Sequence, residues 1–159
     1  MGTKVSQSRL MFVSFQYRDG AFVAFVPVEA IARDHVLSHT VSAASRSYAK
    51  SIRRLKVLIR NMQASRKGRR PIRALQAWRV GDEIFSLRRA LADLSLELDG
   101  VYDHLTKHLG VSRTWLKRAV TFRRHLPDPR CIPSALAWAR CKDRPRRVAE
   151  QLRAPMQGE

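Results

Sequence analysis

The sequence predicts a mainly α-helical bundle with a small N-terminal β-hairpin. Apolar residues recur every three or four positions after Thr40, which is the helical period, whereas residues 10–26 are rich in aromatic and β-branched residues around a turn. With 159 residues, 45% of them hydrophobic, the chain has the size and composition of one domain that buries a core. We expect a hairpin and short helix over 1–40, a basic helical bundle over 41–143, and a basic C-terminal tail over 144–159.

The hairpin prediction is based on strand-forming residues on both sides of a turn. Leu10, Phe12, Phe15 and Tyr17 precede Arg18-Asp19-Gly20, a sequence typical of tight turns. Residues 22–26 then form the return strand. An isolated hairpin is marginally stable in water, so this one must pack on helices or on another subunit. A short helix over 28–37 is expected to follow it.

Two long helices are expected to form most of the bundle. The first spans about 42–65, where Ile52, Leu55, Leu58 or Ile59, and Met62 recur at helical spacing. The second spans 72–98 and directly follows Pro71, a residue favoured where a helix starts. Gly81 lies inside this second helix and weakens it.

Shorter helices are expected in the remainder of the chain, over 101–109, 112–125 and 134–142. Gly100 ends the preceding helix, and Gly110 separates the first two short ones. The tail from Arg144 onward has two interpretations, a last basic helix or a frayed end.

The charge distribution is the strongest functional signal. The chain has 31 Lys and Arg residues against 13 Asp and Glu, a formal net charge of +18. Between Arg46 and Arg79 there are twelve Lys or Arg residues and no Asp or Glu. Like charges three or four residues apart on a helix repel each other, so such a stretch needs an external anion. Nucleic-acid phosphates are the favoured anion and a membrane surface is the alternative.

The candidate nucleic-acid-binding residues are the basic residues of the first long helix, of the loop after it, and of the segment 112–124. Arginine predominates among them, and its guanidinium binds two phosphate oxygens at once. They are Arg46, Lys50, Arg53, Arg54, Arg60, Arg66, Lys67, Arg69, Arg70, Arg113, Lys117, Arg118, Arg123 and Arg124.

Residues 101–120 resemble a bacterial helix-turn-helix. Leu105, Leu109, Val111 and Leu116 have the spacing needed to pack two helices together, Gly110 permits the sharp turn, and Ser112 can cap the second helix. The resemblance implies that Arg113 and Lys117 project from a recognition helix. The alternative is a structural corner whose basic outer face touches only phosphates.

Two functions follow from these patterns. In size, charge and helicity the chain resembles the small helical subunit of a multi-subunit CRISPR effector, which implies a structural, backbone-tracking role in a nucleoprotein complex with other subunits or with copies of itself. The alternative is a sequence-specific DNA-binding regulator or plasmid-maintenance protein that uses 112–124 in the major groove. RNA and DNA both remain possible ligands.

No pattern indicates an enzyme, a cofactor or a membrane protein. His104 and His108 share a helix face, but Cys131 and Cys141 are too far apart in sequence for a typical zinc site, so surface histidines and buried thiols are the favoured interpretation. The three tryptophans, Trp78, Trp115 and Trp138, are expected to pack in the core or between helices, and Trp115 is the one best suited to the alternative of stacking on a base. The longest apolar run, 21–28, is too short to span a bilayer. We expect a cytoplasmic protein that binds no metal.

Overall fold

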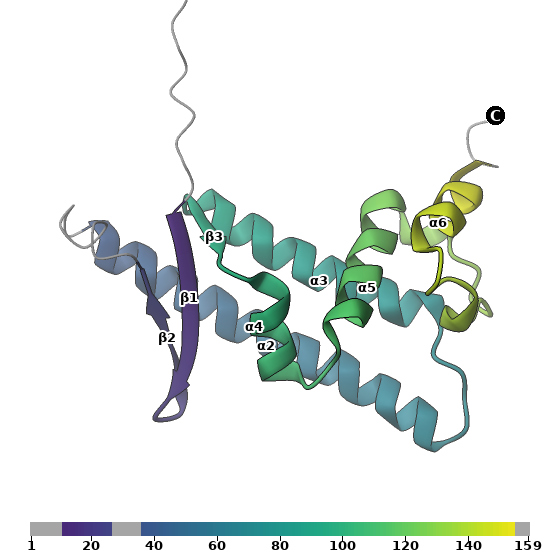
Figure 1. Ribbon diagram of the computed structural model, residues 1–159, viewed down its shortest axis with the longest axis horizontal. Coiled ribbons are helices and arrows are strands. Elements are labelled where there is room, and N and C mark those ends of the chain that lie inside the picture. The colour runs from purple at the N-terminus through teal and green to yellow at the C-terminus, as the bar shows by residue number, and fades with distance from the viewer. Residues whose placement is uncertain (1–10, 27–35, 155–159) are drawn as a thin grey trace, which may run out of the picture.

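The computed structural model describes residues 11–26 and 36–154 (Figure 1). Within them the fold is mainly helical, with a small N-terminal β-hairpin, as the sequence predicts. The helix expected over 28–37 lies largely outside the described residues. Among the described residues, no helix is both long enough and apolar enough to cross a membrane.

The predicted hairpin is confirmed. It consists of β1 (Met11–Arg18) and β2 (Ala21–Phe25), paired antiparallel with Tyr17 opposite Phe22. Asp19 and Gly20 connect the strands with φ angles of 51° and 81°, which the two-residue turn requires. The inner face packs on a helix, where the Phe15 ring stacks on Tyr48 at a centroid distance of 4.2 Å.

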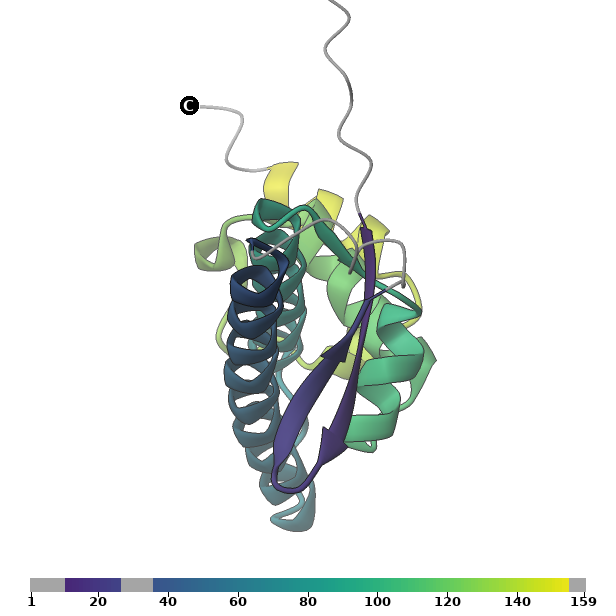
Figure 2. The ribbon, with the colours of Figure 1, turned by 90° about the vertical axis from the view of Figure 1, so that its left-hand side faces the viewer.

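The first long helix, α2 (Val36–Lys67), is longer than predicted at both ends. Its apolar side is the one that the sequence indicates, since Ile52, Leu55, Ile59 and Met62 are all buried. Figure 2 shows the hairpin lying between this helix and α4 (Val101–Leu109).

The second long helix is shorter than predicted. It is α3 (Ala74–Asp93), so Pro71 precedes its N-cap residue, Arg73, rather than occupying its first turn. The expected helix over 94–98 is wrong. Residues Leu96–Leu98 form β3, a strand parallel to β1 that completes a sheet of order β2-β1-β3.

The leucines of β3 fit the residue spacing of a strand as well as that of a helix. Leu96 and Leu98 alternate with Glu97, so a strand buries both of them, at 1% and 5% exposure. Strand β1 also provides backbone partners at both ends of β3, with Met11 N–H donating to the Ser95 carbonyl and Asp99 N–H donating to the Val13 carbonyl, each at 2.9 Å. Pairing with β1 therefore overrides helix propensity.

The two short helices after Gly100 are confirmed as α4 and α5 (Arg113–His125). Gly110 joins them with a left-handed φ of 67°. The Ser112 side chain accepts a hydrogen bond from Trp115 N–H at 3.2 Å and caps α5 as predicted.

The helix expected over 134–142 is wrong. The segment contains a single 3₁₀ turn, Trp138–Arg140, and another, Pro129–Cys131, precedes it. Its backbone pairs with the start of α3 instead, because Ala74 N–H donates to the Leu136 carbonyl and Trp138 N–H donates to the Ile72 carbonyl, at 2.8 and 2.7 Å. A last helix, α6 (Pro145–Arg153), then packs on α5, with Ala149 fully buried.

The core has two parts, which share the helices α3 and α5. The larger part lies between the hairpin, α2, α3 and α4. The smaller part surrounds Trp78, Phe122 and Trp138 under α6. The half-buried Trp115 contacts both parts, and its ring packs against Trp138 at 6.1 Å.

Candidate nucleic-acid interface

The outer side of α2 carries a stripe of basic residues, which we call the α2 stripe. It comprises Arg46, Lys50, Arg53, Arg60 and Lys67. These residues recur at intervals of three, four and seven, so they lie on one helix face, opposite the buried Ile52, Leu55 and Met62. At 1.5 Å per residue the stripe extends about 30 Å along the helix.

The cations of the acid-free stretch are accessible and almost entirely unpaired. All twelve Lys and Arg residues between Arg46 and Arg79 are exposed. Within the described part of the chain, only Arg54 has an ion pair, at 3.9 Å from Glu83. The stretch therefore concentrates positive charge that the protein itself does not neutralise.

A basic loop continues the α2 stripe beyond the end of the helix. Arg69 and Arg70 are exposed there, next to the exposed Arg66 in the last turn of α2. Backbone hydrogen bonds hold the turn, with Gly68 N–H donating to the Ala64 carbonyl at 3.0 Å and Arg70 N–H donating to the Ser65 carbonyl at 2.8 Å. Stripe and loop thus form one continuous cationic surface on a supported backbone.

The basic residues of α5 are in a different setting. Arg113 pairs with Asp103 of α4 at 3.1 Å, and the Lys117 ammonium lies 5.6 Å from the centre of the Tyr102 ring. Arg118 pairs with Asp143 at 3.7 Å. Each of these cations already has an acidic or aromatic neighbour, so this face is less strongly positive than the α2 stripe.

Arg123 has a structural role. Its side chain is 19% exposed, and its Nε donates to an Asp82 carboxylate oxygen at 2.7 Å. Its guanidinium also lies over the rings of Phe85 and Trp78, at 4.7 and 5.4 Å. These contacts hold α5 to α3, so we do not place Arg123 in the interface. Its neighbour Arg124 is exposed.

The interpretation of His104 and His108 as surface residues is wrong. His104 Nε2 lies 2.8 Å from both the backbone N and O of Phe15, and His108 Nδ1 lies 2.7 Å from the Tyr48 hydroxyl. Both rings are half-buried under the hairpin, which the i, i+4 spacing alone does not reveal. The pair docks β1 and α2 onto α4.

The two cysteines lie in the smaller part of the core. Cys141 is buried, which raises the pKa of its thiol to about 11, and Cys131 is half-buried. Among the described residues, no three His, Cys, Asp or Glu side chains gather where they could hold a metal ion.

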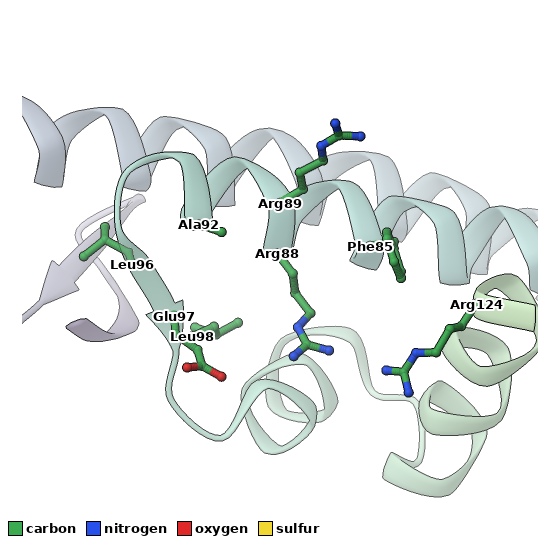
Figure 3. A pocket seen from close by; sticks show the side chains of 8 residues that line it. All are labelled: Phe85, Arg88, Arg89, Ala92, Leu96, Glu97, Leu98 and Arg124. Carbon is green, nitrogen blue, oxygen red and sulfur yellow. The ribbon is translucent and has the colours of Figure 1, made fainter. Parts of the chain in front are cut away.

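One pocket was not predicted from the sequence. Arg88, which was not a candidate, and Arg124, which was, converge on it beside Phe85 (Figure 3). Sequence analysis missed Arg88 because residues 81–110 contain six acids and only three bases, which gives the segment an acidic average. The relevant signal is the helical phase that places Phe85, Arg88 and Ala92 on one side of α3.

Comparison of the chain with protein families, curated proteins and solved structures finds no match.

Proposed function

We propose that this protein is a non-enzymatic nucleic-acid-binding protein whose α2 stripe and basic loop follow a phosphate backbone. One observation carries the proposal: twelve exposed Lys and Arg residues in a stretch without acids, eleven of which have no ion pair within the described residues. Phosphates are the anions best matched to such a row of guanidinium groups.

Backbone contact is favoured over base recognition by the shape of the surface. The α2 stripe is a straight row about 30 Å long, close to one turn of a nucleic-acid duplex. Charge spread along that length positions a polyanion without selecting its sequence.

A role as a structural subunit of a nucleoprotein complex, such as a CRISPR-type effector, is supported by the outer face of the hairpin. Phe12, Val23 and Phe25 are 53%, 41% and 37% exposed there. Apolar side chains grouped on one sheet face are typical of a surface that another subunit covers. The net charge of +18 would also be neutralised within such a complex.

The direct test replaces two stripe residues by acids. We expect Arg53→Glu with Arg60→Glu to weaken binding to duplex and single-stranded oligonucleotides of unrelated sequence by similar factors, since both residues contact phosphate. Fluorescence anisotropy measures the affinities. Circular dichroism should stay helical, because both side chains are exposed opposite the core.

The control is a charge-matched double variant, Arg140→Glu with Arg147→Glu. These residues are exposed near the C-terminus, and the change lowers the net charge equally. A control that loses as much affinity as the stripe variant would contradict a defined interface. Binding to anionic lipid vesicles without binding to any oligonucleotide would assign the stripe to membranes.

The second candidate is sequence-specific DNA binding through α5. It is favoured by the helix-turn-helix arrangement of α4 and α5, with Gly110 in the left-handed region and Ser112 as cap. If it is correct, selection from random duplexes will yield an enriched motif that Arg113→Ala abolishes, at a cost of about 1–3 kcal/mol on the preferred site. We expect no motif, because Arg113 is paired with Asp103.

A further inference from the structure

A pocket of about 440 Å³ lies between α3, β3 and α5, away from the α2 stripe. Its apolar lining is contributed by Phe85, Ala92, Leu96 and Leu98. The volume is within the range of small-molecule sites, which begins near 300 Å³. Gly81 marks the close contact of α3 with α5, and the pocket lies beside Phe85 and Ala92, farther along α3 (Figure 3). The Arg123 guanidinium of α5 covers one side of the Phe85 ring, 4.7 Å from its centre.

Two arginines face each other across this pocket. Figure 3 shows Arg88 extending from α3 and Arg124 extending from α5 toward the same space below Phe85, whereas Arg89, which also lines the pocket, directs its guanidinium to the other side of α3. Within the described residues, neither Arg88 nor Arg124 has an ion pair within 4.0 Å. Glu97 of β3 also lines the pocket, but within the described residues it forms no ion pair with either guanidinium. The two guanidinium groups repel each other, and an anion between them would remove that repulsion.

We propose that the pocket binds one unpaired nucleotide, with its phosphate between Arg88 and Arg124 and its base on the apolar lining beside Phe85. The inference rests on the proposed nucleic-acid binding and extends it to a preference for single-stranded segments. An aromatic ring next to converging arginines is the combination by which proteins hold unpaired nucleotides.

The observations favour a nucleotide over a peptide carboxylate. A peptide that lies in such a groove usually gains affinity by adding a strand to a sheet edge. Here the adjacent edge strand is β3, which has three residues and offers few backbone hydrogen bonds. A nucleotide needs no such edge, since its phosphate and base supply both contacts.

The test uses the full chain and the fluorescent nucleotide 2-aminopurine riboside 5′-monophosphate, whose emission is quenched when its base stacks. We expect quenching that saturates, and competition by adenosine 5′-monophosphate. Adenosine without phosphate, ribose 5-phosphate without a base and inorganic phosphate should each compete about tenfold less well, because each lacks one half of the recognition.

Substitutions distinguish nucleotide binding in the pocket from general electrostatic attraction to a basic protein. Arg88→Gln and Arg124→Gln should each weaken nucleotide binding about tenfold, the loss expected for a charged hydrogen bond, whereas the charge-matched control Arg147→Gln, at an exposed residue of α6 outside the pocket lining, should leave it within about twofold. Equal losses in Arg88→Gln and Arg147→Gln would overturn the proposal. So would inorganic phosphate competing as well as the nucleotide, or a peptide C-terminus displacing it more effectively.

The same measurements show whether the nucleotide pocket or the proposed binding of nucleic acid by α2 is wrong. The stripe variant Arg53→Glu with Arg60→Glu should retain binding of the mononucleotide while losing affinity for oligonucleotides. Salt-dependent oligonucleotide binding without any mononucleotide quenching would overturn the pocket alone. Mononucleotide quenching without oligonucleotide binding would support the pocket and overturn the role of α2.

Discussion

Gly81 shows how one residue determines the packing of two helices. A Cβ atom built on it would overlap the Ala119 carbonyl of α5, with its carbon only 2.8 Å away, far inside van der Waals contact. The atom in the way belongs to backbone and cannot rotate aside. From the sequence, Gly81 is only a weakness in α3, but in the structure its missing side chain permits the crossing of α3 and α5.

We therefore expect Gly81→Ala to lower the free energy of unfolding by about 1–3 kcal/mol or more, the cost of overpacking, despite the better helix propensity of alanine. Urea denaturation followed by circular dichroism measures this. Gly68→Ala is the control, because its nearest neighbour would lie at an ordinary 3.5 Å. Equal effects of the two substitutions would contradict a close helix contact at Gly81.

At the scale of elements, the hairpin is held to the helices by aromatic rings and two histidines. Phe15 stacks on Tyr48, and Phe22 contacts both Tyr48 and His108 edge-on at 5.0 Å. Burial raises the pKa of Tyr48, so its hydroxyl stays protonated and can donate to the Nδ1 of a neutral His108. The junction thus depends on the charge state of His108.

This dependence predicts an effect of pH on stability. Burial lowers the pKa of His108, and the nearby charges of His104, Lys107 and Lys56 lower it further. The folded protein therefore takes up a proton at His108 less readily than the unfolded chain, whose histidines titrate near pH 6.5. The stabilisation is complete above that pH and is lost as the pH falls from 6.5 through the folded-state pKa.

The measurement compares the free energy of unfolding of the wild type and of His108→Gln between pH 5 and 8. We expect the wild type to lose more stability than the variant on acidification, because glutamine keeps a hydrogen-bonding side chain but does not titrate. Parallel curves for the two proteins would mean that His108 does not sense pH in the fold.

At the scale of the whole molecule, charge is distributed unevenly over the fold. The cations of α2 and its loop have almost no acidic neighbours, whereas Arg113, Arg118 and Arg123 of α5 pair with Asp103, Asp143 and Asp82. Asp82 and Asp103 thus link α5 to α3 and α4, and the long outer side of α2 stays positive. Such asymmetry directs a polyanion to α2.

Binding at that side should depend strongly on salt. If about 6–10 phosphates are contacted, affinity will fall by roughly 10³–10⁵ between 50 and 200 mM salt, because condensed counterions are released on binding. Titrations at several salt concentrations give the slope. The variant Arg53→Glu with Arg60→Glu should reduce that slope by about two or more, one for each lost phosphate contact. A flat salt response would refute the interface.

Local sequence determined much of this structure. The hairpin and its turn, the core side of α2, and the break between α4 and α5 follow from patterns within a few residues: alternation, helical period, and Gly20 or Gly110 at positions with positive φ. The α2 stripe could also be predicted, because a helix that buries Ile52 and Leu55 must expose Arg53 and Arg60 on its other side.

Contacts distant in sequence decided the rest. Leu96 and Leu98 suit a helix or a strand, and only pairing with β1 selects the strand. Residues 134–142 do not form the expected helix, because their backbone is hydrogen-bonded to the start of α3 instead. Arg123, Arg88 and Arg124 are alike as sequence, yet an acid and two rings bind the first, whereas the other two face an open pocket. Such differences depend on which elements meet, and therefore only the tertiary structure determines them.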